Sequence, residues 1–397
     1  MSTRIGDAVS ILGGLLGQAG RIALDRAQRR YLGPDDVPAR IEELTPQWLE
    51  GVLRQRSPAA RIAAISQLSA DVGTTQRARF RVTYHSAQDA AALPASIFVK
   101  IAPADPRTRI FVSLFRLGPT EVRFYKEAAA ALPVERPGVY HAALSRGAER
   151  FVLILEDLAG SVQFRDTTTP ADHQEACRVV QMLARLHATF WESPRLTGDL
   201  AWLKSQQNNP TLSLERSIWS LAIKPGMDKF RELIPAPLHR SVGQLAGAFD
   251  LIAAACARGP RTLIHGDVHI GNLFFRQAAV GLFDWQCAQR GQGMRDVSYF
   301  MCSSMPIRLR RMHERELLEL YRETLAAAGA SELPSREALF AQHRWHALYT
   351  WGAMAITAAA ASLQAEPIVR AALERSAAAV LDLESMELLC GAGAKKI

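Results

Sequence analysis

The sequence predicts an α+β protein with two lobes, a small β-rich lobe followed by a larger and mainly helical one. Short strand-like runs dominate the first 160 residues, and long runs with helical periodicity dominate from about residue 171. No internal repeat or low-complexity linker separates the two parts. A chain of 397 residues, 48% of them hydrophobic, is also long enough to bury a large core.

The small lobe combines strands with two helices. Residues 41–56 predict a short helix with Thr45 as its N-cap and Pro46 in its first position. Residues 121–132 predict a second helix. Runs rich in β-branched and aromatic residues predict strands, and one of these runs alternates polar and apolar residues as a half-buried strand does. The strands are expected at 61–70, 76–85, 95–100, 137–145 and 151–158.

The large lobe is expected to be helical, apart from one compact patch of short strands at 262–285. In this patch the strand TLIH leads into the loop GDVHIGN, and a second strand, LFF, is followed by a turn and by GLFDWQ. Helical periodicity covers 171–192, 212–222, 237–258, 311–328 and 336–391. The expected organisation is a helical N-terminal extension at 1–40, a small lobe at 41–156 and a large lobe at 157–397.

Three oxygen-bearing side chains are expected to meet at the edge of the strand patch. Asp267 and Asn272 lie on one loop, and Asp284 comes at the end of the next strand. Two carboxylates and an amide oxygen are hard ligands, which suit Mg²⁺. A direct transition-metal site built on His265, Asp267 and His269 is the alternative, as in metal-dependent hydrolases.

Phosphoryl transfer needs a metal ion, a lysine on the phosphates and an acid that orients the attacking hydroxyl. Lys100 closes the strand SIFVK, and Glu121 lies on the following helix, 21 residues later. That spacing allows a strand–loop–helix return that pairs the two side chains. Glu127 competes for the same role, and Glu121 is preferred for its place before FYKE.

These motifs resemble the aminoglycoside phosphotransferase and choline kinase superfamily, whose catalytic loop reads H-G-D-x-H-x-x-N. HGDVHIGN matches every fixed position, and FDWQ is similar to the family's metal-binding segment. EVRFYKEAA, FVLILEDL and LARLHATFW look most like the ecdysteroid-kinase-like branch. The likeness runs from about residue 41 to the C-terminal helices. It implies a two-lobed protein-kinase-like fold with a nucleotide-binding small lobe and a catalytic large lobe.

The resemblance also implies a role for individual residues. Asp267 would be the catalytic base, Asn272 and Asp284 would hold Mg²⁺, and Lys100 would contact the phosphates of ATP while pairing with Glu121. Further positions carry the remaining roles: His269 for the transferring charge, His265 and Asp296 for support of the loop, and Glu156, Asp157 and Leu158 for the hinge that meets adenine.

One departure from the family pattern concerns the loop between the first two strands. The stretch DVGTTQRARF carries a single glycine, Gly73, where a glycine-rich loop is expected. Backbone amides around Gly73 and the hydroxyls of Thr74 and Thr75 remain the candidates for phosphate contact. The grip on the nucleotide is therefore expected to be weaker, and the choice between ATP and GTP stays open.

The expected function is ATP- and Mg²⁺-dependent phosphorylation of a hydroxyl group on a small molecule. The net charge of +8 argues mildly against polycationic aminoglycosides, and the likeness to the ecdysteroid-kinase-like branch favours an apolar, sterol-like alcohol. A kinase-like module that binds nucleotide without catalysis is a further alternative. No G-x-S-x-G or G-x-x-x-x-G-K-[ST] motif occurs, so the α/β-hydrolase and Walker-type classes lose their main signature.

Composition narrows the partners and the compartment. The basic residues are scattered and interleaved with acids, with no zinc-finger or RNA-binding signature, so nucleic acid is not the expected partner. No apolar run reaches the ~20 residues of a membrane-spanning helix. Five widely spaced cysteines without a C-x-x-C pair favour a reducing cytoplasm. The oligomeric state cannot be read from the sequence.

Overall fold

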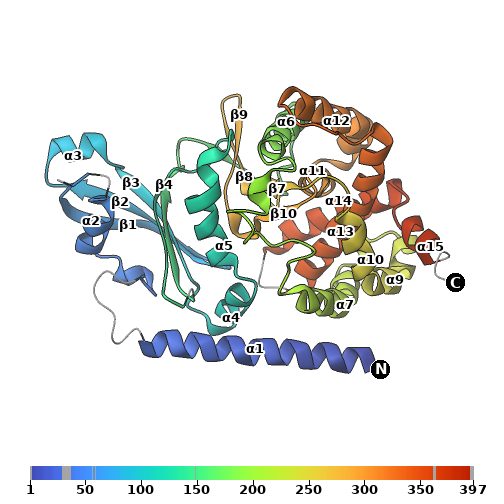
Figure 1. Ribbon diagram of the computed structural model, residues 1–397, viewed down its shortest axis with the longest axis horizontal. Helices are drawn as coiled ribbons and strands as arrows, with labels where there is room; N and C mark the ends of the chain where they lie inside the picture. The colour runs from blue at the N-terminus through green and yellow to red at the C-terminus, as the bar shows by residue number, and fades with distance from the viewer. Residues whose placement is uncertain are drawn as a thin grey trace. The chain divides into compact units, whose positions relative to one another are not determined.

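The computed structural model describes residues 2–28, 37–55, 57–58, 60–147, 149–360 and 364–393 (Figure 1). The chain forms two compact units. The first holds residues 1–130 and 136–162, and the second holds residues 131–135 and 163–397. The first unit contains an antiparallel sheet and the second is mainly helical, so the predicted α+β class with a small β-rich lobe and a large helical lobe is confirmed.

The sheet of the first unit has five strands in the order β1-β2-β3-β5-β4, and all neighbouring strands are antiparallel. Each predicted strand is present, with ends that differ from the prediction by at most two residues. The strands are β1 (Ile62–Val72), β2 (Gln76–Tyr84), β3 (Ser96–Ile101), β4 (Val139–Leu144) and β5 (Phe151–Glu156). A short helix that was not predicted, α3 (Ala87–Ala92), connects β2 to β3.

One face of this sheet is covered by the segment before β1. The 3₁₀ turn η2 (Ile41–Glu43) is followed by α2 (Pro46–Leu53), the short helix predicted within 41–56. Thr45 caps α2, since its hydroxyl accepts the Trp48 N–H at 3.1 Å, and Pro46 fills the first position as predicted. Apolar side chains of η2 and α2 pack into the core of the sheet with Phe80, Val99 and Ile154.

The chain between β3 and β4 forms two helices, α4 (Pro106–Leu114) and α5 (Leu117–Arg123). The predicted helix at 121–132 therefore begins earlier, and it continues beyond Arg123 as a π-helical turn and a 3₁₀ turn. Gly118 is required for the close approach of α5 to β5, because a Cβ atom there would lie 2.1 Å from the Phe151 ring. This contact fixes the helix that carries Glu121.

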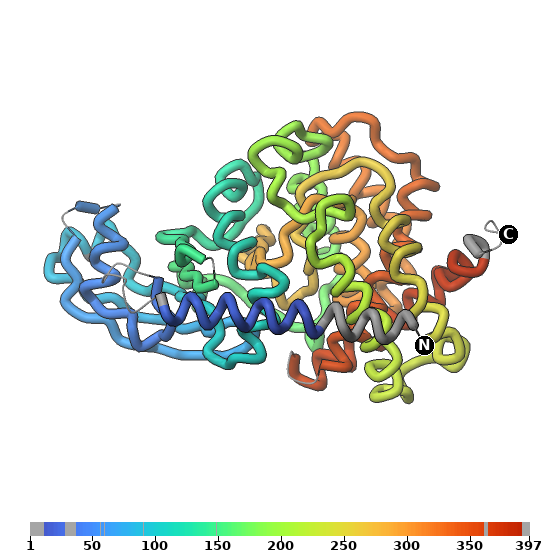
Figure 2. Tube along the Cα trace, turned by 60° about the horizontal axis from the view of Figure 1, so that its bottom comes forward, coloured from blue at the N-terminus to red at the C-terminus, as the bar shows by residue number. Residues whose placement is uncertain are grey.

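The N-terminal helix α1 (Ser2–Gln28) is docked on the first unit and runs beside α4 (Figures 1 and 2). Two of its polar side chains are buried. Gln18 donates a hydrogen bond of 2.5 Å to Glu149, and Asp25 accepts one of 2.8 Å from Arg150. Buried polar groups are costly unless they are paired, so these contacts hold the helix in register.

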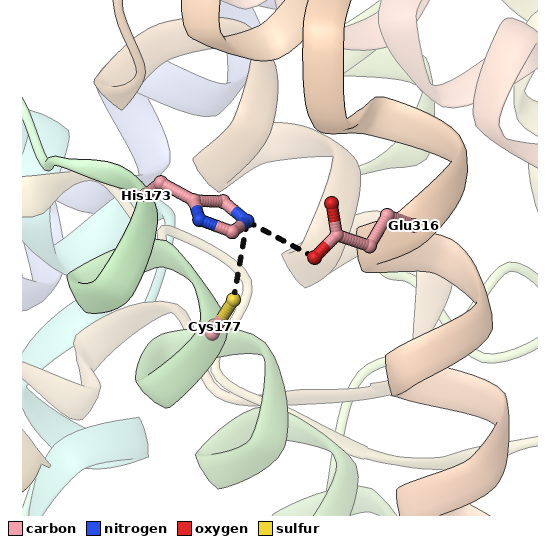
Figure 3. A group of neighbouring side chains, drawn as sticks. All are labelled: His173, Cys177 and Glu316. Carbon is pink, nitrogen blue, oxygen red and sulfur yellow. Dashed lines mark hydrogen bonds and ion pairs between the residues drawn. The ribbon is translucent and has the colours of Figure 1, made fainter.

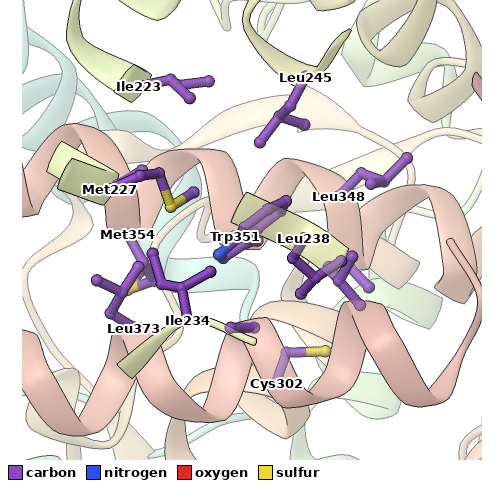
Figure 4. Packing of buried hydrophobic residues seen from close by; sticks show 14 of the residues in the cluster. Ile223, Met227, Ile234, Leu238, Leu245, Cys302, Leu348, Trp351, Met354 and Leu373 are labelled. Carbon is purple, nitrogen blue, oxygen red and sulfur yellow. The ribbon is translucent and has the colours of Figure 1, made fainter. Parts of the chain in front are cut away.

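The second unit packs its helices around a large apolar core that includes Ile223, Leu348 and Trp351 (Figure 4). The principal helices are α6 (His173–Thr189), α7 (Leu212–Lys229), α11 (Met294–Ser304), α12 (Ile307–Ala327), α13 (Arg336–Ala359) and α14 (Glu366–Asp382). The periodic stretch 336–391 holds α13, α14 and most of α15 (Glu387–Gly393). In the described part of the chain, no helix combines the length and the apolar character needed to cross a membrane.

Two expectations for the second unit are corrected. The predicted helix at 237–258 is three short helices, α8 (Ala236–Arg240), α9 (Val242–Gly247) and α10 (Phe249–Cys256). The backbone leaves helical geometry at Ser241 and Ala248, where ψ rises to 3° and 12°. The helix α11 was not predicted, and nearly all of its residues are buried.

The strand patch of the second unit contains two pairs. The strands β8 (Leu273–Arg276) and β9 (Ala279–Leu282) form an antiparallel hairpin, with Leu273 opposite Leu282. The strand β7 (Thr262–Ile264) pairs with β10 (Gln289–Gly291), and the short β6 (Gln163–Phe164) adds to β8. The chain leaves β7 and β9 near the same place, and the candidate site is built there.

Candidate functional site

The loop that follows β7 is anchored from behind by Asp296, in the first turn of α11. The buried carboxylate of Asp296 accepts the backbone N–H of His265 at 2.7 Å and that of Gly266 at 2.9 Å. His187 on α6 lies 3.3 Å from the same carboxylate and 2.8 Å from the hydroxyl of Tyr321 on α12. Burial alone would raise the pKa of Asp296, but the hydrogen bonds from His187 and Gly266 outweigh it, and this pKa lies below its usual range.

His265 connects this loop to the end of β9. Its Nε2 donates to the backbone carbonyl of Phe283 at 2.9 Å, and its Nδ1 accepts the backbone N–H of Asp267 at 3.3 Å. Both ring nitrogens are therefore used, as in a neutral imidazole that carries its proton on Nε2. The ring is fully buried and packs against Trp285, with ring centroids 4.7 Å apart.

Asn272 joins Asp267 to the hairpin. Its Nδ2 donates to the Asp267 backbone carbonyl at 2.9 Å and to the Asp267 carboxylate at 3.2 Å. Its own carbonyl accepts the N–H of Phe283 at 3.1 Å, so Asn272 lies beside the residue that precedes Asp284. Because the amide nitrogen is used by Asp267, the side-chain oxygen of Asn272 is the atom that remains for a metal ion.

Asp284 turns the chain at the end of β9. Its backbone is left-handed (φ 63°, ψ 62°), a conformation that is uncommon for residues other than glycine but that aspartate adopts more readily than most. Burial raises the pKa of the nearby Cys287 thiol, and the charges of both Asp267 and Asp284 raise it further. Both carboxylates thus lie near the half-buried Cys287, and Asn272 is bonded to Asp267 and to Phe283, the residue before Asp284.

The exposed edge of the loop carries Asp267 and His269. Their side chains are 25% and 21% exposed, and His269 Nε2 lies 3.7 Å from the Asp267 carboxylate. His269 is held by its Nδ1, which accepts the Gly271 N–H at 3.1 Å, and Ser304 accepts the Ile270 N–H at 2.9 Å. These hydrogen bonds fix the backbone of the loop, and the loop presents a carboxylate and an imidazole to solvent.

Tyr299 is part of this site and was missed by sequence reasoning. It lies on α11, three residues after Asp296, and it is 7% exposed. Burial raises the pKa of Tyr299 well above its usual range, and the charge of Asp267 beside its hydroxyl raises it further. A helix at 294–304 would have placed Tyr299 and Asp296 on one face, so the missed helix explains the missed residue.

The first unit contains the Lys100–Glu121 pair. Lys100 Nζ on β3 lies 2.5 Å from the Glu121 carboxylate on α5, and these residues are 3% and 1% exposed. Glu127, the alternative partner, instead accepts two hydrogen bonds of 2.9 Å from Arg123. The structure therefore pairs Lys100 with Glu121.

The other nucleotide-binding candidates of the first unit lie at the β1–β2 turn. Gly73 donates its N–H to the Thr75 carbonyl at 3.0 Å, which closes a tight turn over Gly73, Thr74 and Thr75. The Thr75 side chain is buried, whereas Gly73 and Thr74 are half-buried. This short turn takes the place of the long glycine-rich loop, as the single glycine suggested.

The segment after β5 is fixed by its own acidic side chains. Glu156 and Gly138 exchange two hydrogen bonds, of 2.7 and 3.0 Å. Asp157 binds the Arg79 guanidinium with two bonds of 2.9 and 3.0 Å; burial would raise the pKa of Asp157, but Arg79 outweighs it and keeps the pKa low. The Leu158 carbonyl accepts the N–H and the hydroxyl of Ser161. These contacts set the shape of the hinge, and its contact with adenine stays a prediction.

A small β-rich unit with a buried lysine–glutamate pair and a helical unit with an H-G-D-x-H-x-x-N loop on a hairpin define a kinase-like protein. The chain belongs to the ecdysteroid kinase-like family, whose model matches residues 73–331. The resemblance to this branch of the kinase-like phosphotransferases is therefore confirmed. No curated protein sequence matches the chain.

The solved structures to which this chain is similar include a macrolide 2′-phosphotransferase from Brachybacterium faecium. The match has 16% identity, covers 80% of this chain and 98% of that one, and has a TM-score of 0.43. The GDP complex of aminoglycoside 2′-phosphotransferase-IIIa matches at 14% identity over 89% and 100%, with a TM-score of 0.45. Plasmodium vivax ethanolamine kinase matches at 10% identity over 81% and 83%, with a TM-score of 0.46. The family assignment rests on the family model alone.

Proposed function

We propose that this protein transfers the γ-phosphoryl group of ATP to a hydroxyl group of a small molecule, with Mg²⁺ as its metal ion. The observation that carries the proposal is the hairpin contact at Asn272. Its side chain holds the Asp267 carboxylate at 3.2 Å, while its backbone carbonyl is bonded to Phe283, directly before Asp284. This contact supports the proposal that Asp267 acts as a base beside oxygen ligands at Asn272 and Asp284, on one edge of β8 and β9.

In this proposal Asp267 orients the attacking hydroxyl and accepts its proton. The Asn272 amide and the nearby Tyr299 hydroxyl keep the carboxylate in place, and His269 stands beside it to stabilise the transferring charge. Asn272 and Asp284 offer oxygen ligands, which fit Mg²⁺. When bound, this ion would neutralise charge on the phosphates.

The nucleotide would bind to the first unit. Lys100 would contact the phosphates, and its hydrogen bond to Glu121 would keep the ammonium in position. The turn at Gly73, Thr74 and Thr75 would add backbone and hydroxyl contacts, and residues 156–158 would meet the base. ATP is the proposed donor, and GTP is the alternative that the loop with a single glycine leaves open.

The acceptor is proposed to be an apolar, sterol-like alcohol. The side chains near Asp267 include Tyr299 and Tyr349, and the Arg295 guanidinium lies 3.8 Å above the centre of the Tyr349 ring. Aromatic rings beside a half-buried cation favour an apolar or neutral molecule, because Arg295 would repel a polycationic amino sugar. This agrees with the net charge of +8.

The proposed division of labour keeps residues 1–40 as an extension, residues 41–156 for the nucleotide and residues 157–397 for catalysis and the acceptor. We further propose that the protein acts in the cytoplasm without nucleic acid or an integral membrane anchor. The hydrolase alternative loses support, because both ring nitrogens of His265 are already hydrogen-bonded and cannot also bind a metal ion.

The decisive experiment compares Asp267→Asn with the native chain. ADP release with Mg²⁺ and ATP is measured against a panel of amino sugars, choline and sterol-like alcohols, and the product is identified by mass spectrometry. Loss of the base is expected to lower kcat by roughly 10²–10⁴ with any acceptor that is turned over. Asp199→Asn is the matched control, because Asp199 is an exposed carboxylate of the same unit that pairs with Arg195 on the surface.

The outcomes separate the alternatives. Unchanged turnover in Asp267→Asn would remove this residue as the base. Stabilisation of the native chain by ATP and Mg²⁺ without turnover of any acceptor in the panel would favour the non-catalytic nucleotide-binding module. Hydrolytic activity that depends on zinc, with no response to nucleotide, would favour the hydrolase.

A further inference from the structure

A second group of side chains suited to metal binding lies outside the candidate site, between α6 and α12. His173 and Cys177 are one turn apart at the start of α6, and Glu316 faces them from α12 (Figure 3). His173 and Cys177 are half-buried and Glu316 is exposed, so an ion can reach them from solvent. No part of the proposed phosphotransfer chemistry uses these three residues.

Two of the three separations between the ligand atoms are already close to those that a metal ion requires. His173 Nε2 lies 3.5 Å from Cys177 Sγ and 3.2 Å from Glu316 Oε1, and all three atoms lie within 4.8 Å of one another. Ligands of a tetrahedral zinc ion, with bonds of roughly 2.0–2.3 Å, stand about 3.3–3.8 Å apart. Little movement of the side chains would therefore be needed.

A fourth residue supports this arrangement. His313 on α12 is 2.7 Å from the other oxygen of Glu316, and its ring stacks on that of His173 with centroids 3.7 Å apart and planes at 23°. A hydrogen bond to the second oxygen of a ligating carboxylate orients that ligand, as partners behind metal ligands commonly do. The stacked ring also restricts the rotation of His173.

We propose that His173, Cys177 and Glu316 bind one Zn²⁺ ion, with water as the fourth ligand and His313 orienting Glu316. The ligand chemistry selects zinc over magnesium, since a thiolate and an imidazole suit zinc and Mg²⁺ takes oxygen ligands. The thiolate and the carboxylate together carry two negative charges, which balance the charge of the ion. On binding, the thiol proton of Cys177 passes to solvent.

Because the site lies between α6 and α12, metal binding there would link these two helices. The helices α6 and α12 also meet at His187 and Tyr321, and His187 is bound to Asp296. Zinc would add a second link between the same two helices and so stabilise the support of the loop. The ion itself takes no part in phosphoryl transfer, so this site and the proposed activity can be tested separately.

The experiment uses the full chain, without an affinity tag, after dialysis against chelator. Zinc binding is measured by calorimetry in the presence of millimolar Mg²⁺, and Co²⁺ serves as a spectroscopic substitute. We expect one zinc ion per chain, a higher melting temperature with zinc, and a near-ultraviolet thiolate-to-cobalt charge-transfer band.

Three variants test the site, two at ligands and one at the residue that orients Glu316. Cys177→Ser and Glu316→Gln should each weaken zinc binding by more than tenfold, and His313→Ala by about tenfold, the range typical for partners behind a ligand. Cys390→Ser is the matched control, because Cys390 is exposed on α15 and far along the chain from the cluster. It should leave both the affinity and the cobalt band unchanged.

Contrary results are equally clear. The proposal fails if the native chain binds no zinc in the titration, if the cobalt complex lacks the thiolate band, or if Cys177→Ser binds zinc as tightly as the native chain. Far-ultraviolet circular dichroism of each variant shows that it is folded. Adventitious binding to surface histidines would give equal affinities in the native chain and all variants, and would also overturn the proposal.

Discussion

The candidate residues of the two units are held in opposite ways. In the first unit Lys100, the proposed phosphate contact, is itself buried at 3% exposure, and its ammonium is bonded to the equally buried Glu121. In the second unit the proposed base, Asp267, is 25% exposed, and the buried groups that support it, His265 and Asp296, stand behind the loop.

A buried charged side chain thus has a different role in each unit. A buried ammonium needs a counter-charge, so Glu121 serves Lys100 directly. Asp296 instead accepts backbone N–H groups of the loop. It therefore fixes the position of the loop, and the carboxylate proposed to act in catalysis belongs to Asp267. Removing a buried partner should therefore disturb charge balance in the first unit and geometry in the second.

The largest effect is expected from Asp296→Ala. The change leaves two backbone N–H groups and the His187 imidazole without their acceptor in a fully buried site. We expect a loss of about 5 kcal/mol in the free energy of unfolding, the upper end for a broken buried pair. Urea unfolding measures it, and turnover should fall as well. A loss no larger than that of the surface variant Asp199→Asn would show that the loop does not depend on Asp296.

The same residue gives a pH dependence with a definite sign. The pKa of Asp296 is lowered in the folded protein, so its contribution to stability is fully present above the pKa of an unfolded aspartate, roughly 3.9; it declines below that pH and is lost as the pH falls through the lower folded pKa. The stability gap between the native chain and Asp296→Ala should therefore narrow from pH 6 to pH 3. Unfolding midpoints at several pH values test this, and a gap that widens on acidification would contradict it.

A smaller effect is expected when the pair of the first unit is broken. Lys100→Met leaves the buried Glu121 carboxylate without the ammonium and should cost about 3 kcal/mol. The double variant with Glu121→Leu replaces both charges by apolar groups and should recover most of that loss. Neither Lys100→Met nor the double variant should turn over substrate. Activity in the stable double variant would show that Lys100 is dispensable for phosphoryl transfer.

Much of this architecture was predictable because it is local. The strands of the first unit follow from β-branched runs, and the loop and hairpin of the second follow from a contiguous motif. Tyr299 and the cluster around His173 were not predictable, since each depends on how helices pack. Almost every residue of the helix α11 is buried, so its place in the fold is set by packing against neighbouring helices.

Tyr299→Phe tests the contribution that the sequence did not reveal. It removes one hydroxyl beside Asp267 and leaves the ring in the core. The free energy of unfolding should fall by about 1 kcal/mol, and kcat should drop by roughly tenfold, which corresponds to a similar energy. Steady-state kinetics measure the second effect. A changed KM for ATP with an unchanged kcat would place Tyr299 outside the catalytic step.

The smallest effect is expected from Glu127→Gln, the matched control for Glu121→Gln. Both glutamates follow β3 on one helical segment, but Glu127 pairs with Arg123 at the surface whereas Glu121 pairs with the buried Lys100. Exposed pairs four residues apart contribute about 0.3–0.5 kcal/mol, so Glu127→Gln should change stability by no more than that and leave the KM for ATP unchanged. Glu121→Gln should impair both, because the ammonium then loses its charged partner. Equal kinetic losses in the two variants would mean that the contact between Lys100 and Glu121 does not decide how the protein handles its nucleotide.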